Sequence, residues 1–430
     1  PELAMTALAE PGTTRAALAC TRGSERTVTC ALIAICALAA ALRFASLGVQ
    51  SLDFDESYTE AIVGGSLGHA LHQIPITEST PPLYYILAWG WTRIFGLGAA
   101  SIRSLSALCG TAVVPVAFLA ARRLSCARAG LIAALLVAVN PLMVWYSQEA
   151  RSYALLALLS ALSFWAFVTA LEDRRTRMLV LWALASAAAL LTHYFAAFLV
   201  VPEATWLLLA QRRRPTVLAS AGVLVVGAAL IPLILRQADN RADWIAHMTL
   251  VSRVKEVAKK WLTGEIAPTR NWELGAVGLP VAAAAVGAAI KLTDRERRGA
   301  VRALAVGGAA GLIPLLLEAA GFHYLISKNV MPALTVLMIG TGVILGARRA
   351  PWLGAAGAAV AAAFFLGLSL AGPFSPSLQR PDYRDAARAL GPPARGQAVV
   401  APRGGDAPLA FYRPGAASLP RGGWPVEQVV

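Results

Sequence analysis

Three carboxylates stand close together directly after the first long apolar run of the chain. Asp53, Asp55 and Glu56 lie within four residues of one another. A carboxylate within hydrogen-bond reach of an attacking hydroxyl can take up its proton, which makes these residues candidates for a general base. The simpler interpretation is a solvated loop that stops a helix at the membrane boundary. For Asp55 we prefer the functional interpretation, because a carboxylate beside the bilayer with a second acid adjacent is costly without a task.

The residues around these acids predict a helix. Asp55 and Glu56 would lie in its first turn, where the helix dipole stabilises negative charge. Tyr58, Ala61 and Ile62 would give the helix an apolar side that lies along the bilayer surface. Glu56 would orient the loop or contact an acceptor, and Tyr58 is a candidate binding residue.

Four further polar clusters interrupt apolar runs later in the chain. In the topology predicted below they all fall on the same side of the membrane as Asp55. Such convergence suggests an active site with carboxylates, cations and aromatic rings around a cavity. The clusters are Glu78–Tyr85, Gln148–Tyr153, His193–Phe195 and Phe322–Asn329.

Several charged residues of these clusters are candidates to bind a substrate. Lys328, Arg151 and Arg103 stand out, because an unpaired cation at a helix end beside hydrocarbon needs an anionic partner. Glu149 is a further candidate, although Glu149 and Arg151 could simply neutralise each other. His193 is a candidate as well, or equally a helix-end residue with a satisfied hydrogen bond.

The remaining candidates are aromatic or uncharged. Tyr84 and Tyr85 could form a platform for a bound ring, but they fit an interfacial aromatic belt at least as well. His323 lies in the last polar cluster, beside Lys328 in sequence, and is a candidate for the same site.

Composition places the chain among membrane proteins. The apolar fraction is 57%, the charged fraction 14% and the mean hydropathy +0.61, values that exclude a water-soluble domain. The net charge of +14 does not indicate nucleic acid binding, because much of the Arg lies in short clusters between apolar blocks and orients the helices. The abundance of Arg, Ala, Gly and Pro suggests a high-GC genome and a bacterial plasma membrane. The five cysteines form no CxxC pair, so neither a disulfide framework nor a zinc site is predicted.

Apolar runs of spanning length predict about eleven transmembrane helices in an all-α polytopic protein. We divide the chain into a cytoplasmic tail at 1–26, a transmembrane domain at 27–372 and a small external segment at 373–430. The expected spans are 27–47, 103–121, 129–146, 153–171, 178–192, 195–211, 216–235, 274–291, 303–320, 329–346 and 351–372.

The segment 81–97 decides the topology. If it does not cross, the later basic clusters all fall on the side of the N-terminus, as the positive-inside rule requires. We therefore expect an interfacial or re-entrant helix there, within a first external loop at 48–102. The clusters are Arg122/Arg123/Arg128, Arg174/Arg175/Arg177, Arg212–Arg214, Lys291 with Arg295/Arg297/Arg298, and Arg348/Arg349.

The external loop at 236–273 disagrees with that rule, but long loops obey it weakly. Its basic residues include Arg236, Arg241 and Arg270. Within it, six apolar residues recur at helical spacing and predict a helix lying flat on the outer leaflet, either without a role or as a wall for a lipid substrate. They are Val251, Val254, Val257, Ala258, Trp261 and Leu262. In the C-terminal segment we expect a short helix at 383–390 and a strand at 397–401.

Several of these stretches together resemble the GT-C fold glycosyltransferases of the protein-mannosyltransferase type (glycosyltransferase family 39-like), a group that also contains the aminoarabinose transferase acting on lipid A. The resemblance covers most of the chain and is strongest from about residue 50 to 200. It rests on the order and spacing of Leu52–Tyr58, Pro81–Tyr85, Arg103–Gly110 and Asn140–Pro141 with Ser147–Tyr153.

The resemblance implies a membrane enzyme that transfers a sugar from a polyprenyl-phosphate-linked donor to a lipid, glycan or protein acceptor, at the external face and with inversion. It places Asp55 at the position of the general base. Cations must stabilise the leaving phosphate, and here the family more often has Arg followed by Tyr where this chain has Lys328 and Asn329.

A transporter or flippase for a lipid or small solute is the alternative from another class. Inverted repeats and midplane binding groups are typical of transporters, whereas the ionisable residues here gather at the external ends of spans. A binding-only export or sensor subunit is a third interpretation. The outer acids could hold Mg²⁺ or Mn²⁺, but a clear set of oxygen ligands is lacking, so no metal or other cofactor is predicted. The sequence does not specify the donor sugar, the acceptor, the polyprenyl length or the oligomeric state.

Overall fold

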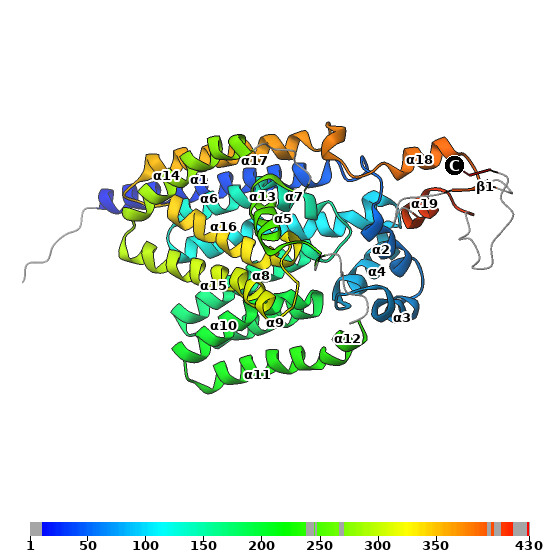
Figure 1. Cartoon of the computed structure of the whole chain (residues 1–430). Helices are drawn as coiled ribbons and strands as arrows, with labels where there is room; N and C mark the ends of the chain where they lie inside the picture. The colour runs from blue at the N-terminus through cyan, green and yellow to red at the C-terminus, as the bar shows by residue number, and fades with distance from the viewer. Residues whose placement is uncertain are drawn as a thin grey trace, which may run out of the picture.

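Helices form almost all of the chain in the computed structural model, which describes residues 11–237, 245, 247–265, 271–393, 397–399, 406–415 and 428–429 (Figure 1). Of the residues named above, Arg241, Arg270 and the end of the expected strand at 401 lie outside the described part. The first half of the chain forms α1 (Pro11–Phe44), α2 (Phe54–Gly64), α3 (Leu67–Thr77), α4 (Leu83–Phe95), α5 (Ala99–Leu124), α6 (Ala127–Val139), α7 (Pro141–Ser147), α8 (Tyr153–Asp173), α9 (Thr176–Thr192), η1 (Tyr194–Ala196) and α10 (Ala197–Ala210).

The second half continues with helices and adds two very short strands. It contains α11 (Arg214–Ala229), α12 (Ile231–Arg236), α13 (Leu250–Thr263), α14 (Asn271–Ile290), α15 (Asp294–Ala319), η4 (Ser327–Val330), α16 (Met331–Leu345), α17 (Pro351–Ala371), η5 (Pro376–Leu378), α18 (Tyr383–Leu390), β1 (Gln397–Ala398), α19 (Asp406–Tyr412) and β2 (Gln428–Val429). The two strands pair in parallel. The expected helix at 383–390 coincides with α18.

The prediction of an all-helical, multi-pass membrane protein is confirmed. Eight described helices are long and apolar enough to cross a membrane, or nine if the bent pair α6–α7 is one span. The expected spans at 178–192 and 195–211 correspond to the shorter apolar helices α9 and α10. The first helix begins at residue 11, and its apolar part, Glu25–Phe44, corresponds to the expected span at 27–47. Every expected span therefore has a helix, while the number of crossings stays a prediction.

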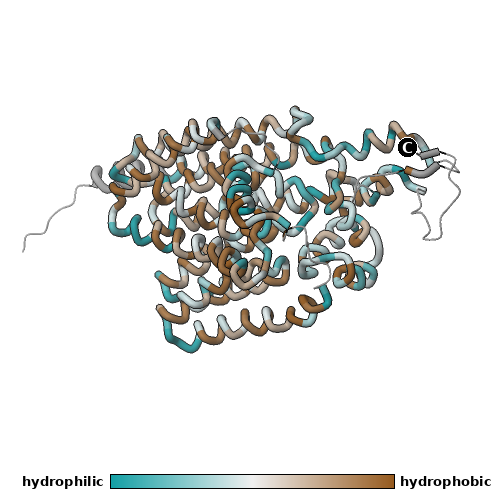
Figure 2. Tube along the Cα trace, viewed as in Figure 1, coloured by the Kyte–Doolittle hydropathy of each residue, from teal (hydrophilic) through white to brown (hydrophobic). Residues whose placement is uncertain are grey.

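The centre of the bundle is formed by α5, α6, α8 and α16, which contribute the largest share of the apolar core. Figure 2 shows that hydrophobic residues predominate along the helices of the bundle. Small residues let α16 approach α6 closely. A Cβ atom on Gly342 would lie 2.5 Å from Cβ of Ala133, and one on Gly346 would lie 2.6 Å from Cβ of Ala129. No larger side chain fits at either glycine, so this contact fixes the spacing of the central helices.

A proline breaks the path of the chain through the bundle between α6 and α7, which meet at a 59° bend. Pro141 has no N–H, so the carbonyl of Val137 loses its helical donor. Arg43 of α1 supplies the replacement, because its Nη2 donates to Val137 O at 3.1 Å and its Nη1 to Ala138 O at 2.8 Å. The bend redirects α7 so that its C-terminal end leads into the polar segment 148–152.

The helices α2, α3 and α4 cover one end of the bundle. With 13 residues, α4 is about 20 Å long, too short for a hydrocarbon core of about 30 Å. This length agrees with the expected interfacial or re-entrant helix. Ile62 of α2 is 2% exposed and packs with Tyr84 and Tyr85 of α4. The prediction that Ile62 faces the bilayer is therefore wrong, because α4 covers it, whereas Ala61 is exposed and Tyr58 half-buried.

The amphipathic helix α13 divides its apolar residues between two surfaces. Val257 is buried, and Trp261 packs against the main core. Val251, Val254 and Leu262 are exposed. The predicted single apolar face is thus split, and only its outer part is free to contact lipid.

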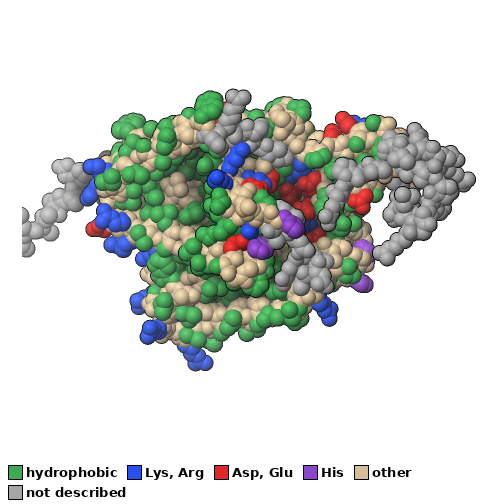
Figure 3. Space-filling view, viewed as in Figure 1, with side chains coloured by type: hydrophobic (Ala, Val, Ile, Leu, Met, Phe, Trp, Pro, Cys, Tyr) green, Lys and Arg blue, Asp and Glu red, His purple; other side chains and the backbone are tan. Residues whose placement is uncertain are grey.

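The basic clusters meet at the opposite end of the bundle from α2–α4 (Figure 3). Arg123 forms ion pairs with Glu172 and Asp173, and Arg295 donates to the carbonyl of Arg123. Arg213 donates to the carbonyl of Arg174. These contacts gather the loops after α5, α8, α10 and α14 at one end, as the charge distribution predicted.

The interfacial placement of α4 can be tested with single cysteines at Ser79 and Gly98, both of which are exposed. If α4 does not cross, an impermeant thiol reagent applied from outside will label both positions in a cysteine-free background. Labelling at Gly98 only after permeabilisation would show that α4 spans the membrane and would overturn the topology.

Candidate active site

A capping box fixes the start of α2 and with it the three acids. Asp53 is the N-cap residue, and its Oδ1 accepts a hydrogen bond from the backbone N–H of Glu56 at 3.1 Å. Oε2 of Glu56 accepts in return from the N–H of Asp53 at 3.3 Å. Two otherwise unpaired N–H groups are satisfied in this way. The prediction that Asp55 and Glu56 lie in the first turn of a helix is confirmed.

Glu56 forms a fully buried ion pair with Arg103 of α5. Nε of Arg103 donates to Oε1 at 2.7 Å and Nη2 to Oε2 at 2.5 Å, and the two side chains are 0% and 1% exposed. The remaining donors of Arg103 bind the carbonyls of Leu47, Gln50 and Ser51. All five donors are therefore used within the protein. Glu56 and Arg103 therefore hold the loop before α2 against α5.

Arg151 is paired across the site with Glu78. Its Nη1 and Nη2 donate to the two carboxylate oxygens of Glu78 at 2.7 and 2.9 Å. Nη1 also lies 3.3 Å from the backbone carbonyl of Asp55. The bidentate pair ties the 148–152 segment to the chain between α3 and α4 and directs a cation towards the start of α2. Arg151 thus pairs with Glu78 and not with Glu149.

Asp55 and Lys328 form an ion pair that remains partly open. Nζ of Lys328 lies 3.2 Å from Oδ2 of Asp55, and the side chains are 27% and 35% exposed, respectively. Burial alone would raise the pKa of Asp55, but the charges of Lys328 and Arg151 and the hydrogen bond from Lys328 lower it to about 2. Asp55 is therefore ionised at neutral pH.

Asp53 and Glu149 share one cation, Arg380, which follows the last long helix. Arg380 lies 3.3 Å from Oδ2 of Asp53 through Nε and 3.2 Å from Oε2 of Glu149 through Nη2. Burial and the nearby charge of Asp53 raise the pKa of Glu149 to about 8, although Arg380 acts in the opposite direction. Glu149 is therefore largely protonated at neutral pH, and Asp53 is the anion that balances Arg380.

A row of aromatic rings begins beside Lys328. Nζ of Lys328 lies 5.6 Å from the ring centre of Tyr153, and the ring of His193 lies 5.7 Å from that of Tyr153. Phe195 follows His193 at 4.9 Å and Tyr324 follows Phe195 at 5.1 Å. Burial and the charges of Arg151 and Lys328 lower the pKa of His193 to about 3. His193 is therefore a neutral ring in this row.

The other expected site residues lie apart from the open pair. Tyr84 and Tyr85 are 0% exposed, and their hydroxyls are bound to Ser106 and Thr80. Tyr58 is half-buried and packs edge-on against Phe54. His323 pairs with Glu318, which is also bound by Arg253 of α13. In this structure Tyr84 and Tyr85 support the site from below its surface, and the contacts of His323 lie in a separate cluster.

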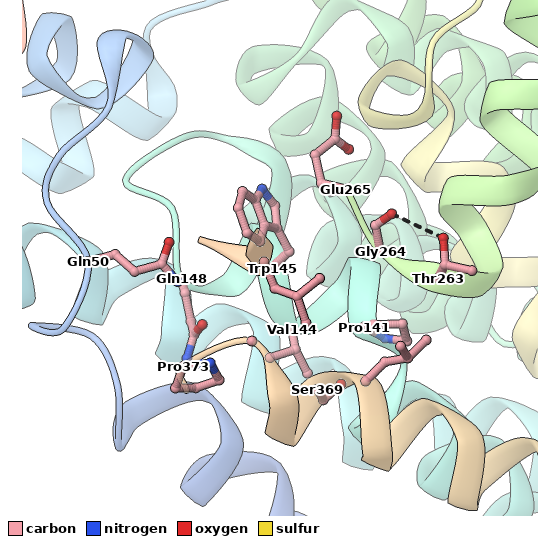
Figure 4. A pocket seen from close by; sticks show the side chains of 13 residues that line it. Gln50, Pro141, Val144, Trp145, Gln148, Thr263, Gly264, Glu265, Ser369 and Pro373 are labelled. Atoms are coloured by element: carbon pink, nitrogen blue, oxygen red, sulfur yellow. Dashed lines mark hydrogen bonds between the residues drawn. The ribbon is translucent and has the colours of Figure 1, made fainter. Parts of the chain in front are cut away.

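A small cavity of about 50 Å³ lies beside the site, between α7, the end of α13 and the end of α17 (Figure 4). The indole ring of Trp145 stands near its centre, between Gln148 and Glu265. Glu265 accepts hydrogen bonds from Tyr146 at 2.9 Å and from Ser327 at 3.2 Å. It thereby connects α7 and α13 to the residue next to Lys328.

The sequence analysis did not assign roles to three of these charged residues. Glu78 lay in a recognised cluster, but its pairing with Arg151 requires the fold. Glu265 and Arg380 lie outside all five clusters, in a loop and in the C-terminal segment. Their charge beside apolar spans was the available signal, and spacing alone does not reveal such partners. Among the described residues, no group of three or more His, Cys, Asp or Glu is arranged to hold a metal ion.

The protonation of Glu149 predicts a pH-dependent stability. Its pKa is about 8 in the folded protein and about 4.3 in an unfolded chain, so its contribution is fully present below pH 4.3 and is lost as the pH rises through 8. Glu149→Gln mimics the protonated acid. We expect its thermal midpoint to exceed the parent's above pH 8 and the difference to shrink near pH 5, with Glu25→Gln, at an exposed position of α1, as the control. A variant that is less stable than the parent at pH 9, with no deficit at pH 5, would show that Arg380 keeps Glu149 ionised.

One segment of the chain matches the sequence model of a known family. Residues 79–235 match the sequence model of the family described as dolichyl-phosphate-mannose-protein mannosyltransferase. The sequence has no match among curated proteins.

Solved structures show the fold. The oligosaccharyltransferase of Archaeoglobus fulgidus, tethered with an acceptor peptide, matches with a TM-score of 0.54 and 13% identity over 84% of this chain and 57% of its own. The same archaeal protein, AglB, in complex with an inhibitory peptide and a dolichol-phosphate, gives a TM-score of 0.53 and 14% identity over 85% and 58%. ArnT from Cupriavidus metallidurans aligns over 90% of this chain and 84% of its own, with 17% identity and a TM-score of 0.44.

The chain spans little more than half the length of the archaeal enzyme. The family match covers the segment that carries Arg151 and His193, and the fold likeness covers most of the chain. The resemblance stated from the sequence is confirmed for the fold: the chain has the GT-C fold, and its residues 79–235 match the protein-mannosyltransferase family.

Proposed function

We propose that the protein transfers a sugar from a polyprenyl-phosphate-linked donor to an acceptor hydroxyl, with inversion, and that Asp55 is the general base. One observation carries the proposal. Glu56–Arg103 and Glu78–Arg151 are almost fully buried, whereas Asp55–Lys328 is about a third exposed. A carboxylate and a cation at an open position are the two groups that such a transfer requires.

The family description and the dolichol-phosphate bound to the archaeal enzyme support a lipid-phosphate donor. In the proposed step the acceptor hydroxyl loses its proton to a carboxylate oxygen of Asp55 and its oxygen bonds to the anomeric carbon. The bond from that carbon to the phosphate oxygen breaks, and the electron pair stays on the phosphate. Lys328 stabilises this growing negative charge. No divalent metal is part of the proposal, because Lys328 supplies the cation.

Lys328 must leave Asp55 for this reaction to proceed. In a single displacement the attacking and leaving oxygens lie on opposite sides of the sugar carbon, so the sugar separates the base from the cation on the phosphate. A base with a pKa of about 2 is also weak for its task. When the donor phosphate binds Lys328, Asp55 loses that neighbour, and burial then raises its pKa towards a useful range.

The row of rings gives the proposal a direction for the donor. Tyr153, His193 and Phe195 follow Lys328 one after another and lack charge. We place the phosphate at Lys328 and the sugar between Lys328 and Asp55. The rings would then contact the sugar or the first apolar part of the lipid.

The face of the membrane follows from charge. The basic clusters occupy the end of the bundle opposite to α2–α4, which favours that end as cytoplasmic and the site as external. Together with the Arg-rich composition, this favours the plasma membrane of a bacterium. The expected lipid, glycan or protein acceptor would then approach from outside.

Asp55→Asn tests the base. The substitution retains size and most hydrogen bonding but cannot accept a proton, so turnover should fall by about 10²- to 10⁴-fold while donor binding persists. The assay is transfer from a synthetic polyprenyl-phospho-sugar, alongside direct measurement of donor binding. Glu60→Gln, on the same helix, serves as the matched control and should keep the parent's rate. Near-parental turnover in Asp55→Asn would exclude Asp55 as the base.

Lys328 is tested by donor affinity. Lys328→Ala removes a charge-assisted contact worth about 1.5–3 kcal/mol, so the Kd for the polyprenyl-phospho-sugar should rise roughly 10- to 100-fold. Lys328→Arg should retain much of the affinity, because a guanidinium also binds phosphate. Equal donor binding by Lys328→Ala and the parent would remove Lys328 from the phosphate site.

A further inference from the structure

The segment that follows the last long helix returns to the loop in front of α2. The backbone N–H of Arg380 donates to Oε1 of Gln50 at 3.0 Å. Oγ of Ser51 donates to the carbonyl of Pro381 at 2.8 Å and accepts from the N–H of Tyr383 at 3.0 Å. The contacts alternate between the two chains, so the segment lies along the loop over several residues.

A second contact comes from α19. The hydroxyl of Tyr412 accepts a hydrogen bond from the N–H of Leu52 at 2.8 Å. Phe411 and Tyr412 pack against the small cluster of Leu52, Ile102 and Ala150. Leu52 immediately precedes Asp53, so the C-terminal segment reaches the residue next to the N-cap of α2.

The side chain of Arg380 is buried within this contact. It is 3% exposed and lies between Asp53 and Glu149. Its guanidinium stacks over the ring of Trp145, with Cζ 4.2 Å from the ring centre. Nη1 donates to the carbonyl of Gln148 at 3.3 Å. An arginine held by two acids, a carbonyl and an indole ring has one defined position.

Asp53 connects Arg380 to the proposed base. Its carboxylate caps the N–H of Glu56 and thereby sets the first turn of α2, in which Asp55 lies. Burial and the charge of Glu56 raise the pKa of Asp53, and Arg380 opposes this rise. Without the cation, Asp53 would be more readily protonated, and a protonated acid is the weaker cap.

We propose that Arg380 is a positioning residue, which holds Asp53 and Glu149 in place and so fixes the orientation of Asp55. The site is complete only when the segment after the last long helix is docked on the loop 48–53. This inference rests on the proposed role of Asp55, and it assigns a task to a segment for which the sequence analysis had none.

Other charged groups also face this region. Asp55 and Glu56 come from α2, Arg103 from α5, Arg151 from the 148–152 segment and Lys328 from η4. Each of these cations has its own carboxylate partner. Arg380 is thus the cation assigned to Asp53 and Glu149 among the described contacts.

Arg380→Met, Arg380→Lys and the double variant Arg380→Met with Asp53→Asn, which removes the unpaired anion and keeps a capping side chain, test the proposal on the full chain. We expect turnover of Arg380→Met to fall on the order of 10- to 100-fold, because small misplacements of a catalytic group have effects of this size. Donor Kd should stay within a factor of about two, since Arg380 lies outside the phosphate contact. The acidic limb of the pH–turnover profile should move to higher pH. Arg380→Lys and the double variant should each recover part of the rate.

A readout that does not depend on activity separates this proposal from the proposed reaction. Phe54 is 41% exposed at the first position of α2, so a spin label on Phe54→Cys in a cysteine-free background reports the mobility of that turn. Arg380→Met should increase the mobility, and Arg380→Lys should increase it by a smaller amount, because lysine keeps the charge but reaches only one of the two acids. Arg388→Ala is the matched control, because Arg388 forms an exposed pair with Asp385 on α18 and should change neither mobility nor turnover.

The outcomes are distinct. Increased mobility with reduced turnover supports the proposal. Unchanged mobility and an unchanged pH profile in Arg380→Met, even with a lower thermal midpoint, would show a merely structural role and overturn it. If Arg380→Met does not fold, Arg380→Lys alone decides: a parental pH profile and parental label mobility contradict the proposal, because lysine cannot reach both acids as a planar guanidinium does. A parental rate in Asp55→Asn with increased mobility in Arg380→Met would instead refute the proposed base and leave the positioning contact supported.

Discussion

A charge removed from water must meet an opposite charge, and this constraint organises the polar end of the molecule. The acids around α2 each find a cation from a distant part of the chain: Glu56 from α5, Asp55 from η4, and Asp53 from beyond the last long helix. Each pair joins segments that are distant in sequence. The ion pairs and the small apolar clusters together determine where the short helices lie on the bundle.

Solvent exposure distinguishes ion pairs that only stabilise the fold from the pair that a ligand can reach. Pairs that are closed to solvent and have every donor engaged, such as Glu56–Arg103, cost a great deal to break and offer nothing to a ligand. Asp55–Lys328 has the same composition but remains accessible, so a phosphate can exchange with the carboxylate as the partner of Lys328. In the proposed function, the same kind of pair is a scaffold where it is buried and a binding site where it is exposed to solvent.

The sequence predicted the parts of this arrangement that depend on local pattern. Apolar run length predicted a helix for every span, and the placement of Asp55 and Glu56 predicted the start of α2. The topology also brought together segments that the structure shows in contact, such as those of Asp55 and Lys328. The sequence did not predict which residues of distant segments form pairs. Arg103 was expected to bind substrate because its actual partner, Glu56, lies 47 residues earlier and cannot be recognised from the sequence. Arg380 was overlooked because the sequence around it has no periodic pattern. The burial of Ile62 was missed for a similar reason, since an amphipathic pattern does not say whether lipid or protein covers the apolar side.

The proline break between α6 and α7 has a consequence for how the chain is assembled in the membrane. Arg43 satisfies the carbonyls of Val137 and Ala138 that Pro141 leaves open, yet within the described residues it has no carboxylate partner. Until α6 is synthesised, the first helix carries an uncompensated cation near the edge of the hydrocarbon, and α6 in turn has bare carbonyls until Arg43 arrives. Each helix alone would therefore expose an unpaired polar group to lipid. Association of the two helices is therefore favoured over separate contact of either one with lipid, so the broken helix depends on α1 for its place in the membrane.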